Sequence, residues 1–178
     1  NTTGLSHISV YLDENIEKLE KLSDANESVT GLTTGFVDLD RRTAGLHPAE
    51  FILIAARPGM GKTSMALNLA LNVARSSGQA VAVFSLEMSR EQLATRLLSN
   101  ESFVDNQKLT TGKLDEEDWG KLSLASSALS QTDIRVDDNP AITVPEIKAK
   151  CRRLGDELGL IVIDYLQLMH VGGRHMDN

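Results

Sequence analysis

The sequence predicts an α/β fold built around a mostly parallel sheet, preceded by an amphipathic helix. Segments typical of buried strands alternate with segments of helical periodicity along most of the chain. One of the strands, GLIVID at 159–164, is an apolar run that suits a strand covered on both faces. A Gly-rich turn, ARPGMGKTS at 56–64, lies between a strand and a helix, which is where phosphate-binding loops occur.

An amphipathic helix is expected over residues 7–22. Its apolar residues recur at spacings of four, four, three and three, the pattern of one helix face; they are Ile8, Leu12, Ile16, Leu19 and Leu22. The next stretch, SDANESVTG, is polar and rich in turn-forming residues, so residues 1–30 are expected to be a helix and a linker. The apolar face must be covered, either by the helix's own domain or by another subunit.

The remaining residues, 31–178, carry the alternating pattern. A short helix and a turn are expected within 32–50. Acidic residues in DEEDW and Pro145 support the starts of two of the later helices. The expected strands cover 51–56, 79–85, 133–138 and 159–164, and the expected helices cover 63–76, 90–100, 115–131 and 143–158.

Composition excludes several classes of protein. The 178 residues have a formal net charge of −7 and 41% apolar residues, so the chain can bury a core and is a poor candidate for a protein coated in nucleic acid. The single cysteine, Cys151, rules out an internal disulfide, and its place in an expected helix favours a small buried side chain over a reactive thiol. We find no run of about 18 apolar residues and no signal peptide. We therefore expect a cytoplasmic protein with no membrane partner, and Asn1 in place of methionine indicates a start inside a longer polypeptide.

The stretch at 56–64 matches a nucleotide-binding loop except at its first position, where alanine replaces glycine. Ala56 ends a strand and only begins the turn, so a methyl group fits there if φ stays negative. Gly59 and Gly61 supply the backbone freedom that lets N–H groups converge on a phosphate. Lys62 is expected to reach the β- and γ-phosphates and Thr63 to bind Mg²⁺. The expected nucleotide-binding residues of the loop are Ala56, Arg57, Pro58, Gly59, Met60, Gly61, Lys62, Thr63 and Ser64.

Two carboxylates and an arginine complete the predicted site. Asp164 ends the last strand, at the sheet edge where ligands bind in open α/β folds, and is a candidate ligand for Mg²⁺. Glu87 follows the second strand and is a candidate base for activating water. Arg96, on the next helix, is a candidate contact to nucleotide or to a neighbouring subunit. Each residue has a structural alternative: Asp164 could cap its strand, Glu87 could be bonded at a helix start, and Arg96 could be a solvated surface arginine.

The last residues, HVGGRHMDN, are Gly-rich and polar. Arg174 beside two glycines could contact a nucleic-acid phosphate backbone, and the alternative is an ordinary surface loop. His170 and His175 lack metal-ligand spacing and partners, which excludes a zinc site.

Three stretches taken in order, ARPGMGKTS, FSLEMSREQLATR and LIVIDYLQLM, closely resemble the replicative hexameric DNA helicases of bacteria, the DnaB family. GLTTGFVDLDRRTAGLHPAEFILIAARP is similar to the start of that family's RecA-like P-loop ATPase domain, and LTTGKLDEEDW also fits. The resemblance covers nearly all of residues 8–178, and the family commonly has alanine at the position of Ala56. It implies ATP-driven 5′ to 3′ translocation on single-stranded DNA and duplex unwinding by a homohexameric ring. ATP and Mg²⁺ are the implied cofactors, and primase and a helicase loader are implied partners.

The resemblance also assigns roles to residues. The helix over 7–22 matches the linker helix that docks on the neighbouring subunit. This favours another subunit, and not the helix's own domain, as the cover for its apolar face. The segment from His170 matches the start of a DNA-contacting loop, to which Arg174 belongs. By motif, the catalytic and metal-binding positions are Lys62 and Thr63 (Walker A), Asp164 (Walker B) and Glu87 (the water-activating glutamate).

The sequence departs from the family at its ends. It stops before the strand that carries the phosphate-sensing glutamine, the second DNA loop and the arginine finger, and in RecA-like sheets that strand lies between the Walker A and Walker B strands. We therefore expect residues 31–178 to hold the N-terminal part of a RecA-like domain with an incomplete sheet and unpaired backbone groups. Such a fragment is expected to be inactive and unstable by itself. Two other functions remain open: a RecA-like recombinase or related ATPase, and a non-catalytic interaction fragment.

Overall fold

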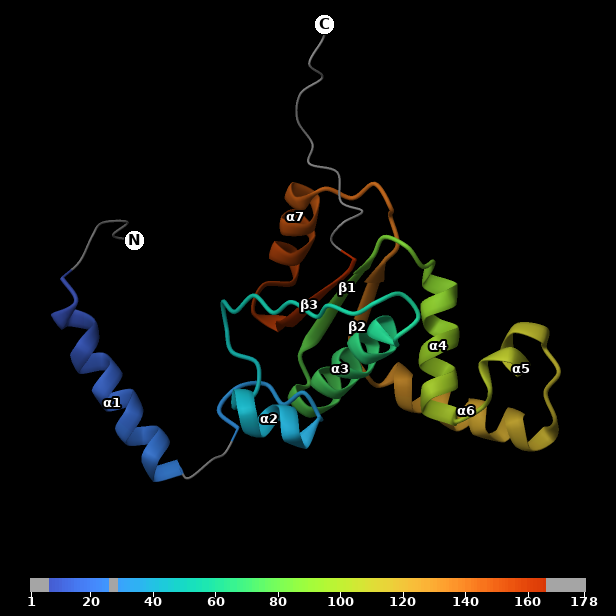
Figure 1. Cartoon of the computed structure of the whole chain (residues 1–178), viewed down its shortest axis with the longest axis horizontal. Coiled ribbons are helices and arrows are strands. Elements are labelled where there is room, and N and C mark those ends of the chain that lie inside the picture. The colour runs from blue at the N-terminus through green and yellow to red at the C-terminus, as the bar shows by residue number, and fades with distance from the viewer. Residues whose placement is uncertain (1–6, 26–28, 166–178) are drawn as a thin grey trace, which may run out of the picture. The chain divides into compact units, whose positions relative to one another are not determined.

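The structure, a computed structural model, describes residues 7–25 and 29–165, and the chain divides into two compact units at residues 50 and 51 (Figure 1). The first unit holds α1 (Ser9–Ala25) and α2 (Val37–Thr43). In the second unit the helices are α3 (Lys62–Ser77), α4 (Arg90–Ser102), α5 (Asn106–Thr111), α6 (Glu116–Ser130), α7 (Val144–Leu154) and the 3₁₀ turn η1 (Gly155–Glu157). Its strands are β1 (Ala80–Ser85), β2 (Ile134–Asp137) and β3 (Leu158–Asp164).

Within the first unit, α1 is a helix without a buried residue. All five residues of its predicted apolar face are exposed, from Ile8 to Leu22. No helix of the described residues is long and apolar enough to cross a bilayer. The segment around α2 is held by a β-bridge between Leu32 and Leu46 and by the buried carboxylate of Asp40, which accepts hydrogen bonds from the Thr34 N–H and hydroxyl.

The second unit is built on a parallel sheet in the order β2-β1-β3. In register, Phe84 of β1 lies beside Asp137 of β2 and Ser85 lies beside Asp164 of β3. The carboxyl ends of the three strands therefore meet at one edge, as the alternation of strands and helices predicted. The α/β fold class is confirmed.

Alternating residues of β1 serve the two faces of the sheet. Ala82 and Phe84 pack with Ile147 and Cys151 of α7 in the core. Val81 and Val83, also buried, point to the opposite face, and α3 packs against β1 and β3 and crosses in front of the sheet in Figure 1. Burial raises the pKa of the Cys151 thiol, in keeping with a structural cysteine.

Three helices begin where their capping residues stand. Ser89, Asp115 and Thr143 are the N-caps of α4, α6 and α7, each in a capping box with the residue three positions later. These bonds satisfy N–H groups that the first helical turn leaves without partners. The expected helices at 90–100, 115–131 and 143–158 are therefore found with small shifts, the last one ending in η1. The short helix α5 was not expected.

The strand predicted at 51–56 is wrong. These residues form no regular secondary structure and make no backbone hydrogen bond within the described part of the chain. Phe51 and Leu53 are 80% and 71% exposed. A strand needs a neighbour for its N–H and C=O groups, and no described strand is hydrogen-bonded to this segment. β3 also differs from the expectation of two covered faces, because Ile161 is 43% exposed.

Candidate functional site

The loop between residue 56 and α3 has the backbone of an anion-binding turn. Gly59 and Gly61 have φ values of +77° and +83°, a region that favours glycine. The Met60 N–H donates to the Arg57 carbonyl at 3.3 Å. Space beside both glycines is open, with no atom within 4 Å of an added Cβ, so glycine is required for conformation and not for packing. Gly61 is the N-cap of α3, which directs the positive end of the helix dipole toward this loop.

Three of the predicted residues meet at the end of this loop. The Thr63 hydroxyl donates to Asp164 Oδ2 at 2.8 Å, and Lys62 Nζ lies 3.6 Å from Asp164 Oδ1. Lys62 and Thr63 begin α3, whereas Asp164 ends β3, so the contact joins residues about a hundred positions apart in sequence. The Asp164 side chain is only 8% exposed and that of Lys62 is 28% exposed. The carboxylate is thus enclosed, and the ammonium group can reach solvent.

Tyr165 also belongs to this group, although it was not among the residues predicted from the sequence. Lys62 Nζ lies 4.1 Å from the centroid of its ring, a cation–π contact. The ring and Asp164 together restrain the Lys62 side chain. The signal for Tyr165 was its position directly after Asp164.

Glu87 lies on the loop that follows β1, at the same edge of the sheet. The Leu86 N–H donates to the Asp164 carbonyl at 2.8 Å, so the backbone on the N-terminal side of Glu87 is bonded to the residue at the centre of the site. The Glu87 side chain is exposed and makes no hydrogen bond or ion pair with any described residue. A glutamate bonded at the helix start is therefore not what the structure shows; Ser89 and Gln92 fill that role.

A second interaction at this edge was not predicted. Asp138, directly after β2, accepts three hydrogen bonds from Arg90, the first residue of α4. The bonded Arg90 guanidinium holds the pKa of the Asp138 carboxyl below its ordinary value, and Asp138 raises the pKa of Arg90. The sequence signal was again a carboxylate just past a strand end.

The other predicted residues are less constrained. Ala56, Arg57 and Pro58 are exposed in the loop, and Ser64 lies in the first turn of α3. Arg96 lies on α4, half-buried, and within the described residues no hydrogen bond or ion pair joins it to the loop. Arg174 lies outside the residues that the structure describes, as do His170 and His175.

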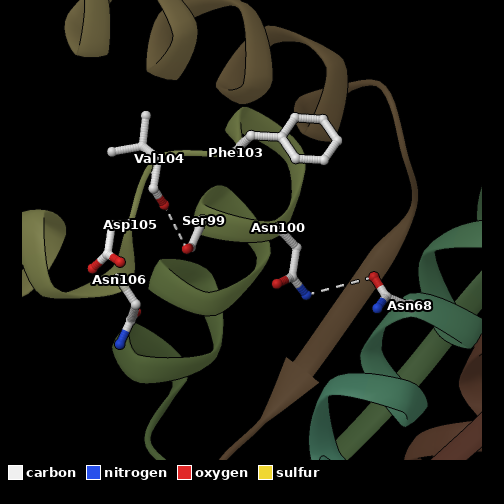
Figure 2. Close-up of a pocket in the computed structure, with 7 residues that line it drawn as sticks. All are labelled: Asn68, Ser99, Asn100, Phe103, Val104, Asp105 and Asn106. Carbon is white, nitrogen blue, oxygen red and sulfur yellow. Dashed lines mark hydrogen bonds between the residues drawn. The ribbon is translucent and has the colours of Figure 1, made fainter.

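A cavity of about 570 Å³ lies away from the predicted residues. It is lined by Asn68 of α3 and by the end of α4 with the turn that follows (Figure 2). The amides of Asn68 and Asn100 face one another at 3.5 Å, and the Ser99 hydroxyl donates to the Val104 carbonyl at 2.7 Å (Figure 2). None of the residues assigned above to the phosphate loop or to its carboxylates lines this cavity.

The donors at the loop suit a magnesium ion bound together with phosphates. Hydroxyl and carboxylate oxygens, supplied here by Thr63 and Asp164, are the ligands that Mg²⁺ prefers. No cluster of three or more acidic, His or Cys side chains that could hold a metal occurs in the described ranges.

The family model of the DnaB-like helicase C-terminal domain matches residues 31–178. The replicative DNA helicase DnaC of Bacillus subtilis is 49% identical over 180 residues, a match that covers 100% of this chain and 40% of that protein. The replicative DNA helicase DnaB of Geobacillus stearothermophilus is 48% identical over 177 residues, covering 98% of this chain and 39% of that protein. The chain therefore spans about 40% of the length of these relatives.

Solved structures agree with these sequence matches. One of them, described as an ATPase domain, superimposes with a TM-score of 0.86 at 32% identity, covering 98% of this chain and 62% of that one. A DnaB-like replicative helicase, described with its interactions with primase, gives a TM-score of 0.82 at 34% identity and covers 92% of this chain and 41% of that one. The predicted RecA-like class of fold is confirmed by this likeness.

Proposed function

Because this chain belongs to the family of DnaB-like helicase C-terminal domains, we propose that it forms part of the ATP-hydrolysing motor of a replicative DNA helicase. The motor moves 5′ to 3′ along single-stranded DNA and unwinds duplex at the replication fork. The observation that carries the proposal is the meeting of Lys62, Thr63 and Asp164 at the end of a Gly-rich loop. The fold class supports it, since open α/β sheets bind ligands at the carboxyl ends of their strands.

ATP with Mg²⁺ is the proposed ligand of this site. The N–H groups of the loop, with the α3 dipole, bind phosphate oxygens, and the residues from Ala56 to Ser64 form the cradle. In this structure Lys62 contacts Asp164 and Tyr165, and its side chain is partly exposed, so phosphate can reach it. Thr63 and Asp164 hold Mg²⁺, which supplies neutralisation of phosphate charge when bound.

Glu87 is the proposed base that orients and activates water. Its carboxylate is exposed and without a partner in the described chain, so it is available to accept a hydrogen bond from water. The Leu86–Asp164 backbone bond keeps its loop next to the metal-binding carboxylate. Arg96 is kept as a secondary candidate for contact with nucleotide or with a neighbouring subunit.

We propose a homohexameric ring in which α1 is a linker helix that packs on a neighbouring copy. The exposed apolar face of α1 supports this, since such a face is stable in water only when it is covered. Single-stranded DNA is the proposed occupant of the ring, with Arg174 as a contact. Primase and a helicase loader are further proposed partners, the first supported by the description of one structural neighbour.

Unwinding of tailed duplexes tests the proposed function. With the natural full-length protein, ATP and Mg²⁺, we expect strand separation of forks that offer a 5′ single-stranded tail for loading. A duplex with only a 3′ tail is the matched control and should stay paired. Hydrolysis that drives strand exchange without unwinding would favour a RecA-like recombinase, and unwinding from 3′ tails alone would contradict the assigned polarity.

A further inference from the structure

The segment from Ser85 to Arg90 is fixed on both sides of Glu87. On the N-terminal side, the Leu86 N–H is bonded to the Asp164 carbonyl. The buried Ser85 hydroxyl accepts the Met88 N–H at 3.2 Å, a bond that spans Glu87. On the C-terminal side, Arg90 is bonded to Asp138. The position of this short stretch of backbone limits where the Glu87 carboxylate can lie, because its side chain has no partner among the described residues.

The Arg90–Asp138 pair joins the loops that follow two neighbouring strands. Asp138 Oδ2 accepts the Arg90 backbone N–H at 3.0 Å, and Oδ1 accepts Nε and Nη2 at 3.1 and 2.7 Å. The backbone bond exists whatever side chain stands at position 90. Since Asp137 is paired in register with Phe84 of β1, the pair lies at the same sheet edge as Asp164.

Asp138 is held by a rigid turn. The Asp137 and Asn139 side chains each accept a backbone N–H two residues on, both at 3.0 Å, and Ile142 at the end of the turn is 1% exposed in the core. The Asp138 side chain is 17% exposed, whereas that of Arg90 is 67% exposed. An ion pair with so exposed an arginine contributes little to stability, so of the three bonds the one to the Arg90 backbone constrains the loop most, beside the capping box of Ser89 and Gln92.

We infer that Asp138 is a positioning residue for hydrolysis: through the Arg90 backbone it fixes the loop that presents Glu87 to the nucleotide. The inference rests on the proposed role of Glu87. Among the described residues, the side chain of Asp138 is bonded to Arg90 and not to the phosphate loop or its metal-binding residues, so its loss should leave nucleotide binding intact. A displacement of about 1 Å in a reacting group can cost about 10²-fold in rate, so a loosened loop affects turnover first.

Graded substitutions in the assembled full-length protein test this inference. Asp138→Ala removes all three bonds, Asp138→Asn keeps the shape and one acceptor, and Arg90→Ala keeps the backbone bond. Asp133→Ala is the matched control, because Asp133 makes a similar two-bond pair with Arg135 at the other end of β2. The readouts are kcat and KM for ATP at saturating single-stranded DNA, with the thermal midpoint measured alongside.

We expect kcat to fall by roughly 10²-fold in Asp138→Ala, less in Asp138→Asn and only a few-fold in Arg90→Ala, with KM within about twofold throughout. Asp133→Ala should match wild type. In a Glu87→Gln background, Asp138→Ala should add little further loss, because both changes act through one group.

Three outcomes overturn the inference. If both Asp138 variants keep the wild-type kcat and the Glu87→Gln protein is inactive, the inference is overturned and the role of Glu87 stands. If the fall in kcat of the double variant equals the product of the two single-variant falls, Asp138 acts independently of Glu87. A Glu87→Gln protein with the wild-type rate overturns both this inference and the proposed role of Glu87. If Asp138→Ala does not fold, Asp138→Asn and Arg90→Ala decide among the same outcomes.

Discussion

Replacing Lys62 by alanine is expected to abolish ATP turnover and to weaken nucleotide binding. The side chain carries the only cation of the described chain that contacts Asp164, and it stands at the first turn of α3, where phosphates are expected. Removing one preorganised group that stabilises charge in the transition state typically lowers the rate by about 10²–10³-fold. The measurement is steady-state ATP hydrolysis together with titration of a fluorescent ATP analogue.

The fold should survive this substitution. Asp164 keeps its hydrogen bond from Thr63, so its buried carboxylate is not left without a partner. Lys121→Ala is a suitable control, because it removes an exposed lysine whose ion pair, within the described part of the chain, is with Glu117 on α6. Wild-type hydrolysis by Lys62→Ala would show that the Gly-rich loop is not the phosphate site.

Replacing Glu87 by glutamine is expected to leave nucleotide affinity within about twofold and to remove turnover. A positioned general base contributes about 10²–10⁴-fold, and glutamine has the shape of glutamate without its basicity. The substitution should cost no stability, since the Glu87 side chain is exposed and has no partner in the described part of the chain.

The control is Glu91→Gln, which removes the same charge from the exposed first turn of α4. Rates should be measured in the assembled protein, because a neighbouring subunit's arginine can itself contribute about 10³–10⁵-fold in related phosphoryl-transfer enzymes. Equal rates for wild type and Glu87→Gln would assign the activation of water to another group.

Much of the second unit could be predicted because its signals are local. Ser89, Asp115 and Thr143 mark helix starts through hydrogen bonds to residues three positions away. Lys62 and Thr63 follow a Gly-rich turn with a conformation that few other residues adopt. The grouping with Asp164 followed from topology alone, since parallel strands end at one edge.

What could not be predicted depends on neighbours distant in sequence. The 51–56 segment has the composition of a strand, but strand formation depends on a partner, and none of the described strands is hydrogen-bonded to it. The Arg90–Asp138 pair joins residues 48 positions apart, and no periodicity in the sequence predicts such a contact. The helix α5, with the sequence NQKLTT, has too few apolar residues to show a helical stripe.

The most direct test of the account is ATP hydrolysis by the assembled protein with and without single-stranded DNA. Ile16→Asp, in the exposed apolar face of α1, supplies the comparison in which assembly is weakened, and Lys21→Asp places the new acid on the opposite face of the same helix. We predict that single-stranded DNA raises the hydrolysis rate of wild type and of Lys21→Asp. In Ile16→Asp, the loss of assembly should lower the hydrolysis rate. A rate that is the same in all three proteins and indifferent to DNA would contradict the proposal that this loop belongs to an assembled DNA motor.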